Sequence, residues 1–185
     1  HHHTEDIMRT PQLITLGVVA LSLTALRSLG AQTAAQALAA PPEFSSRSAE
    51  YEQRAVDLYS DITRAAEAAR LHRWSAQLRA DNDPEAVESL AMAARLFGYA
   101  HQTKQARKTM EEAAERALGM GDVARAARAY LDAAFYAVEL KQNTDIARLG
   151  RKALLLAGSP VLTDEQRKSI TDRIRVDARL ASAVQ

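Results

Sequence analysis

The histidines and carboxylates of this chain are the first residues to consider for metal binding or catalysis. Outside the N-terminal run of three, the histidines are His72 and His101, and neither has a carboxylate or a second histidine at the helical spacing of a metal-ligand pair. The Asp81-Asn82-Asp83 segment begins like a calcium loop, but its sixth position is not glycine and Met92 stands where the loop needs glutamate. The sequence therefore predicts no metal site, and we expect these carboxylates to cap a helix.

Serine nucleophiles and phosphate-binding loops also lack their sequence context. Ser75 and Ser89 are not set in a nucleophile-elbow motif, and Gly119 and Gly121 are followed by Asp122 where a phosphate-binding loop needs lysine and serine or threonine. The 24 basic and 23 acidic residues are interleaved and leave a net charge of only +1, which is not the basic footprint of a nucleic-acid-binding protein. We therefore predict no enzyme activity, no cofactor and no nucleic-acid partner.

Arginine and tyrosine residues are the remaining candidates, because both are enriched among the anchors of protein interfaces. Their spacing places them, with neighbouring carboxylates, on the non-core faces of two expected helices, 84–101 and 123–140. The candidate partner-binding residues are Glu88, Arg95, Tyr99, Arg125, Arg128, Asp132 and Tyr136. The alternative interpretation is that these charged faces are simply solvated and that Tyr99 and Tyr136 are packing residues.

The elements that must position these residues are predicted to be α-helices. Alanine, which has the highest helix propensity, is abundant, whereas aromatic residues make up only 5% of the chain. No stretch alternates apolar and polar residues convincingly, so a sheet has no support. A chain of 185 residues buries one core, and the prediction is one all-α domain.

Turn and capping signals divide this domain into about six helices. The expected helices cover residues 48–80, 84–101, 103–118, 123–140, 143–156 and 164 onward. Asp83 and Pro84 are suited to begin the second helix, the Gly119-Met120-Gly121 segment ends the third, and Thr163 with Gln166 forms a capping box for the sixth. Because the connections are short, neighbouring helices are expected to be antiparallel.

A spaced repetition indicates that these helices form an array. Ala106-Arg107, Ala127-Arg128 and Ala147-Arg148 recur at nearly equal intervals, each near the start of an alanine-rich helical segment. A fixed period of this kind is typical of stacked hairpins, which bury their apolar stripes against their neighbours and leave an extended surface on one side.

The second half of the chain resembles the tetratricopeptide-like helical hairpins. The residues that carry the resemblance are the turn Gly121-Asp122, the second-helix positions Ala126, Tyr130 and Ala133, and the closing Pro160. The family's Leu-Gly pair is absent at its expected offsets, and Leu96-Phe97-Gly98-Tyr99 only echoes it. The resemblance covers about residues 83–160, with pairs of helices repeating at about 41 residues where the family has about 34. It implies a short right-handed α-solenoid with a concave groove and a role in protein interaction.

The N-terminal region carries a signal for export. Met8-Arg9 precedes an uncharged apolar run over 13–26, followed by small residues. At about 1.5 Å per residue this run reaches about 21 Å, short of a hydrocarbon core of about 30 Å. We expect a signal peptide over 8–30, cleaved after Gly30 or Ala39, with an uncleaved anchor or a buried helix as alternatives. Residues 1–7 are interpreted as a tag remnant or an over-extended start, 31–47 as a linker and 48–185 as the helical-repeat domain.

Export and the helical array together give the predicted function. The chain has no cysteine, which excludes disulfides and a lipid-modified cysteine anchor. We predict a periplasmic or secreted bacterial protein that is not stably inserted in the membrane after signal removal. Its predicted role is that of a non-catalytic binding or scaffolding module for another protein or peptide in the cell envelope. The alternative is a structural helical bundle that self-associates through its alanine-rich faces.

Overall fold

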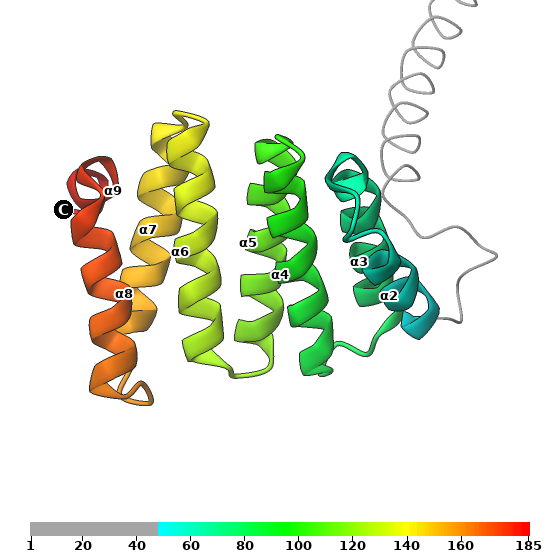
Figure 1. The fold of residues 1–185 in the computed structure, drawn as a ribbon. Coiled ribbons are helices and arrows are strands. Elements are labelled where there is room, and N and C mark those ends of the chain that lie inside the picture. The colour runs from blue at the N-terminus through cyan, green and yellow to red at the C-terminus, as the bar shows by residue number, and fades with distance from the viewer. Residues whose placement is uncertain (1–47) are drawn as a thin grey trace, which may run out of the picture. The chain divides into compact units, whose positions relative to one another are not determined.

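The computed structural model describes residues 48–185, and all the regular structure in this part is helical (Figure 1). The elements are α2 (Ser48–Asp57), η2 (Ile62–Arg64), α3 (Ala65–Leu78), α4 (Pro84–Tyr99), α5 (Thr103–Gly119), α6 (Val123–Glu139), α7 (Asn143–Ala157), α8 (Asp164–Val176) and α9 (Ala178–Val184). The all-α prediction is therefore confirmed for these residues. The predictions made for 1–7, 8–30 and 31–47 lie outside the described residues. No helix within 48–185 has the length and apolar character to cross a membrane.

Alternate helices form two layers. Each helix from α2 to α7 packs against the next one along the chain. Side chains also join helices that are two apart: Arg125 pairs with Glu88 between α6 and α4, and Arg148 pairs with Glu111 between α7 and α5. We call α2, α4, α6 and α8 the even layer, and α3, α5 and α7 the odd layer; Figure 1 shows the two layers one behind the other.

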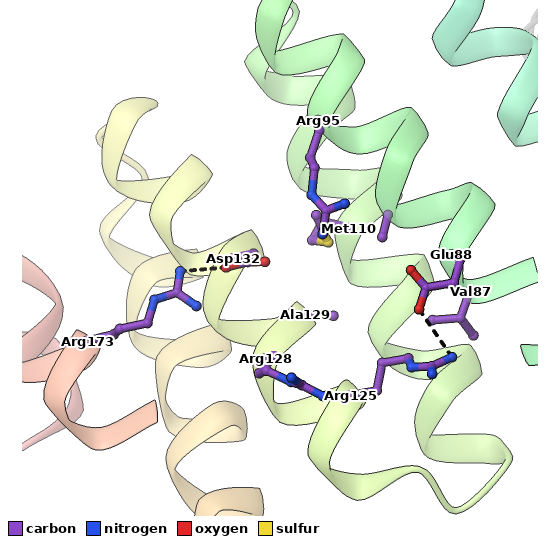
Figure 2. Close-up of a pocket in the computed structure, with 10 residues that line it drawn as sticks. Val87, Glu88, Arg95, Met110, Arg125, Arg128, Ala129, Asp132 and Arg173 are labelled. Atoms are coloured by element: carbon purple, nitrogen blue, oxygen red, sulfur yellow. Dashed lines mark hydrogen bonds and ion pairs between the residues drawn. The ribbon is translucent and has the colours of Figure 1, made fainter. Parts of the chain in front are cut away.

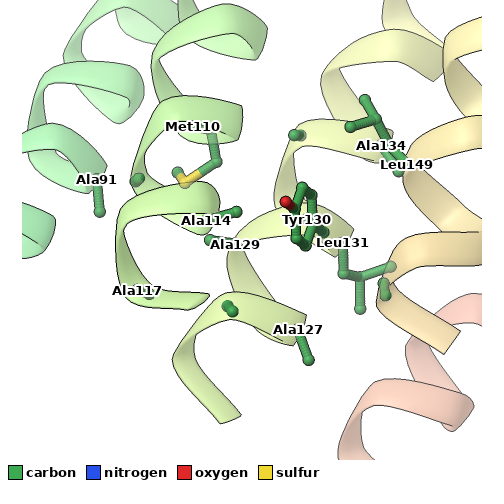
Figure 3. Close-up of a cluster of buried hydrophobic side chains, with 14 of the residues drawn as sticks. Ala91, Met110, Ala114, Ala117, Ala127, Ala129, Tyr130, Leu131, Ala134 and Leu149 are labelled. Carbon is green, nitrogen blue, oxygen red and sulfur yellow. The ribbon is translucent and has the colours of Figure 1, made fainter. Parts of the chain in front are cut away.

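Alanine side chains fill much of the space between the helices (Figure 3). In α6 the fully buried alanines are Ala126, Ala127, Ala133, Ala134 and Ala137. Larger buried side chains, among them Met110, Tyr130 and Leu131, occupy the remaining volume. The helix α6 is therefore buried on two sides, and its core face is wider than the single stripe of apolar residues in the sequence indicates.

Three turns share one backbone geometry. His101, Gly121 and Lys141 are equally spaced along the chain and have φ angles of 56°, 79° and 57°, all in the left-handed region. In each turn the next residue donates its N–H to a carbonyl five residues earlier: Gln102 to Phe97, Asp122 to Ala117 and Gln142 to Ala137. This is the Schellman motif, which satisfies free carbonyls at a helix end.

The equal spacing of these turns sets the repeat of the helices, and two such intervals make one hairpin. In this register the residues equivalent to Ala106 are Ala126 and Ile146, all three of them buried. The repetition seen in the sequence, which equates Ala106 with Ala127 and Ala147, is therefore displaced by one residue from the repeat of the turns. The reason is that it aligns Ala-Arg pairs and not the turns.

The expectation of one helix over 48–80 is wrong. The segment forms α2 and α3, which pack against each other, with η2 between them. Asp61 caps η2: its carboxylate accepts hydrogen bonds from the backbone N–H and the hydroxyl of Thr63, at 3.0 Å and 2.6 Å. Ile62, which continues the apolar spacing of the sequence, is 66% exposed. A local cap therefore ends the helix although the apolar period continues through it.

The single helix expected from residue 164 onward is also divided. Asp177 has extended backbone angles, and its carboxylate accepts a hydrogen bond from the N–H of Leu180. Asp177 thus caps α9, which begins at the next residue. The helix α9 packs closely on α7 at Gly150, where a Cβ would lie 2.7 Å from side-chain atoms of Leu180 and Val184. Glycine at this position allows the close approach.

We predict that Gly121→Ala lowers the free energy of unfolding by about 1 kcal/mol, because alanine is strained at a left-handed φ. Gly119→Ala is the matched control, since Gly119 ends α5 and a Cβ there would meet no atom within 4 Å. This control should leave stability unchanged or raise it by up to about 1 kcal/mol. Urea unfolding followed by circular dichroism measures both, and equal losses in the two variants would contradict the prediction.

Candidate functional site

A pocket of about 280 Å³ lies between α4 and α6, in the even layer (Figure 2). We call it the α4–α6 pocket. Five of the seven candidate residues line it: Glu88 and Arg95 from α4, and Arg125, Arg128 and Asp132 from α6. The others that line it are Val87, Ala91, Met110, Ala129 and Arg173. The structure thus brings together residues that the sequence places on two separate helices.

Helical spacing explains why each helix directs these side chains into one pocket. Glu88, Ala91 and Arg95 are three and four residues apart, as are Arg125, Arg128 and Asp132, so each set lies on one helical face. The opposite faces of α4 and α6 are held against α5. The start of α6 is fixed by Asp122, whose carboxylate accepts a hydrogen bond from the N–H of Arg125 at 3.0 Å.

Two ion pairs form opposite sides of the α4–α6 pocket. Arg125 lies 3.4 Å from Glu88 and 3.2 Å from Asp122, measured between guanidinium nitrogen and carboxylate oxygen. Arg173, from α8, donates to Asp132 at 2.7 Å, and its guanidinium lies 5.1 Å from the centre of the Phe135 ring. Figure 2 shows the Arg125–Glu88 and Arg173–Asp132 pairs as dashed lines.

The other two arginines of the pocket have no carboxylate partner among the described residues. Arg95 and Arg128 are both exposed, and Arg128 donates through Nε to the carbonyl of Ala124 at 3.3 Å. The apolar part of the lining consists of Val87, Ala91, Met110 and Ala129, all of them buried. The pocket therefore combines an apolar lining with guanidinium donors, an arrangement suited to holding an anionic group.

The two candidate tyrosines do not line this pocket. Tyr99 is 65% exposed at the end of α4. Tyr136 packs on α4: its hydroxyl donates to the carbonyl of Ala94 at 3.5 Å, and a Cβ on Gly98 would lie 3.2 Å from its ring. Burial raises the pKa of Tyr136, and the charge of Asp132 adds to the effect. Tyr136 therefore packs α6 against α4.

Neighbouring pockets share residues with the α4–α6 pocket. Glu88 also lines a pocket between α2 and α4, Arg128 one between α6 and α8, and Arg173 one beside Phe135 and Val176. Their volumes are about 390, 340 and 580 Å³ respectively. Because each of these side chains borders two pockets, the pockets adjoin one another along the even layer, and we call this row of adjoining hollows the even-layer groove.

Sequence reasoning missed a buried polar network at the α2 end of this groove. His72, only 3% exposed, has Nδ1 2.7 Å from Glu52 Oε2, and its Nε2 contacts the hydroxyl of Tyr59. Ser89 donates to the other oxygen of Glu52 at 2.5 Å. The network joins α2, the segment after it, α3 and α4. Treating 48–80 as one helix hid it, because Glu52 and His72 become neighbours only when the chain folds back between them.

The electrostatics of this network favour a structural role. Burial alone would raise the pKa of Glu52, but the His72 and Ser89 side chains lower it to about 2. Burial and the charge of Glu52 raise the pKa of Tyr59, so the phenol is not activated as a nucleophile. Within residues 48–185, no group of three or more histidine, aspartate or glutamate side chains is arranged to hold a metal ion.

Comparison with known proteins finds no family model that matches the chain, no similar curated protein and no similar solved structure. The class is therefore defined by the described residues themselves: residues 48–185 form an all-α fold with two layers of helices and a row of charged hollows in one of them.

The pKa of Glu52 predicts how stability depends on pH. A folded-state pKa of about 2, below the ordinary 4.5, stabilises the fold fully above about pH 4.5, and this contribution is lost as the pH falls towards 2. Glu52→Gln should remove up to about 3 kcal/mol of this pH-dependent stability. Urea unfolding between about pH 6 and about pH 3 measures the slope.

Glu67→Gln is the matched control for this prediction. Glu67 lies in the same hairpin and pairs with Arg64 at 2.9 Å, but both side chains are exposed. An exposed ion pair contributes little, so this variant should keep the slope of the unaltered protein. Equal slopes in Glu52→Gln and the unaltered protein would show that the buried network does not control acid stability.

Proposed function

We propose that this chain is an exported, non-catalytic protein-binding or scaffolding module whose even-layer groove receives a segment of another protein or peptide. The observation that carries the proposal is the row of adjoining hollows, since Glu88, Arg128 and Arg173 each border two pockets. A row of neighbouring hollows offers successive sites to the side chains of one polypeptide segment.

The arrangement of the helices supports this proposal. Hairpins that repeat at the equal spacing of the Schellman turns, each packing on its neighbours in two layers, fit a short right-handed α-solenoid of the tetratricopeptide-like kind. Such stacks leave one extended surface free, and this surface is where repeat proteins of this type bind their partners. In this proposal the even-layer groove is that surface.

The chemistry of the groove also favours binding. Its arginines supply planar hydrogen-bond donors, and Ala91 and Ala129 keep some exposed apolar surface beside them. Export to the periplasm or the medium is part of the proposal and rests on the apolar run over 13–26 and its flanking residues. The partner is accordingly sought in the cell envelope.

Self-association is the second candidate function, and exposed leucines on the odd layer favour it. Leu155 is 78% exposed and Leu154 37% exposed on α7, and Leu118 is 40% exposed at the end of α5. Light scattering distinguishes this candidate from the first, because a defined oligomer that captures no partner would support self-association.

A steric block tests the groove. We predict that Glu88→Trp and Arg128→Trp each reduce capture of a specific envelope protein at least about tenfold. Each of these residues borders two pockets, and an indole at either position would occupy space in both. Both positions are exposed, so helicity and Tm should change little. The measurement is affinity capture from envelope extract with the unaltered chain and each variant.

Arg151→Trp is the control for this test, because Arg151 is exposed on α7 in the odd layer. It introduces the same indole outside the groove and should leave capture unchanged. If the groove variants capture the partner as well as the control does, the binding site lies elsewhere.

A further inference from the structure

The α4–α6 pocket has an excess of positive charge. Four arginines line it, Arg95, Arg125, Arg128 and Arg173, against two carboxylates, Glu88 and Asp132. The excess is concentrated on two side chains, because Arg125 pairs with Glu88 and Arg173 with Asp132. Arg95 and Arg128 are left without a carboxylate partner among the described residues.

The paired arginines also link neighbouring helices of the even layer. Arg125 ties α6 to α4 through Glu88, and Arg173 ties α8 to α6 through Asp132 and the Phe135 ring. Guanidinium groups that are already neutralised offer little attraction to a ligand, whereas the two unpaired ones keep their full charge. An anion entering the pocket is therefore drawn to Arg95 and Arg128.

We propose that this pocket receives an aspartate or glutamate side chain of the bound segment, with Arg95 or Arg128 as the donor to its carboxylate. The inference rests on the proposed function and names the chemistry of the partner at one position. Ala91 and Ala129, which keep some exposed surface at the pocket, contact the methylene groups of that side chain or an apolar neighbour. The partner is thus an acidic segment that crosses α4 and α6.

A carboxylate fits this pocket better than a phosphate group. The pocket is partly lined by apolar side chains, and a group of nearly two negative charges loses more hydration energy beside such a lining than a group of one. Arginine pairs with a carboxylate and with a phosphate alike through two parallel hydrogen bonds, so the difference in charge and not the hydrogen-bond geometry separates the two groups. A phosphoserine peptide is accordingly one arm of the test.

The experiment selects peptides from a displayed library of short randomised segments on the full chain. The charge-reversal variant is Arg95→Glu with Arg128→Glu, and the control is Arg70→Glu with Arg151→Glu, two exposed arginines on α3 and α7 in the odd layer. Both variants change the net charge equally, so a difference between them reports the site and not the overall charge. Circular dichroism confirms that each variant is folded.

Three results are expected. Peptides selected on the unaltered chain and on the control are enriched in aspartate or glutamate, and those selected on the charge-reversal variant in lysine or arginine. Replacing the acidic residue of a selected peptide with its amide weakens binding at least about tenfold, the effect of a lost charge-assisted hydrogen bond. A phosphoserine at that position binds more weakly than glutamate.

The results that overturn the inference differ from those that overturn the proposed function. Selected peptides without acidic enrichment, or equal binding of acid and amide peptides, exclude the carboxylate site; the groove itself stands if Glu88→Trp or Arg128→Trp abolishes their binding. Stronger binding of the phosphoserine peptide assigns the pocket to phosphate instead. If no peptide is selected, or if the tryptophan variants bind the selected peptides normally, both proposals fail.

Discussion

Close approach between helices is the constraint on which this structure depends. Isolated helices of this length are marginally stable in water, so each must gain its stability from its neighbours. Fully buried alanines such as Ala113 on α5 and Ala133 on α6 let the backbones come near to one another. This proximity brings helices two apart within reach of a single side chain. Arg116 on α5, for example, donates to the carbonyls of Ala76, Arg79 and Ala80 at the end of α3.

The sequence predicts those helices whose ends carry strong local signals. The expected bounds of the four helices from 84 to 156 agree with α4 to α7 within two residues, because Asp83, Asp122 and the glycines near 120 act locally. The breaks at Asp61 and Asp177 were missed. Each depends on one aspartate within a continuing apolar pattern, and packing against distant helices decides whether such a residue caps or stays helical.

The candidate site follows the same division between local and distant information. Spacing along one helix is local, and it correctly places Glu88 with Arg95 and Arg125 with Asp132 on shared faces. That the two faces meet in one pocket depends on the exact length of the hairpin repeat, which the sequence shows only approximately. Arg173 enters the pocket from α8, and its role could not be predicted without the position of that helix.

The matching turns at His101 and Lys141 also bear on how a chain like this can change in length. Both turns reverse the chain in the same way, and between them lies one complete hairpin, α5 and α6. A duplicated copy of that hairpin would begin and end at turns of the same backbone geometry. Insertion of a single helix, in contrast, would move the helices after it into the other layer, so that odd-layer residues would lie in the even layer. Gene duplication in units of one hairpin would thus lengthen the groove without redesigning its ends.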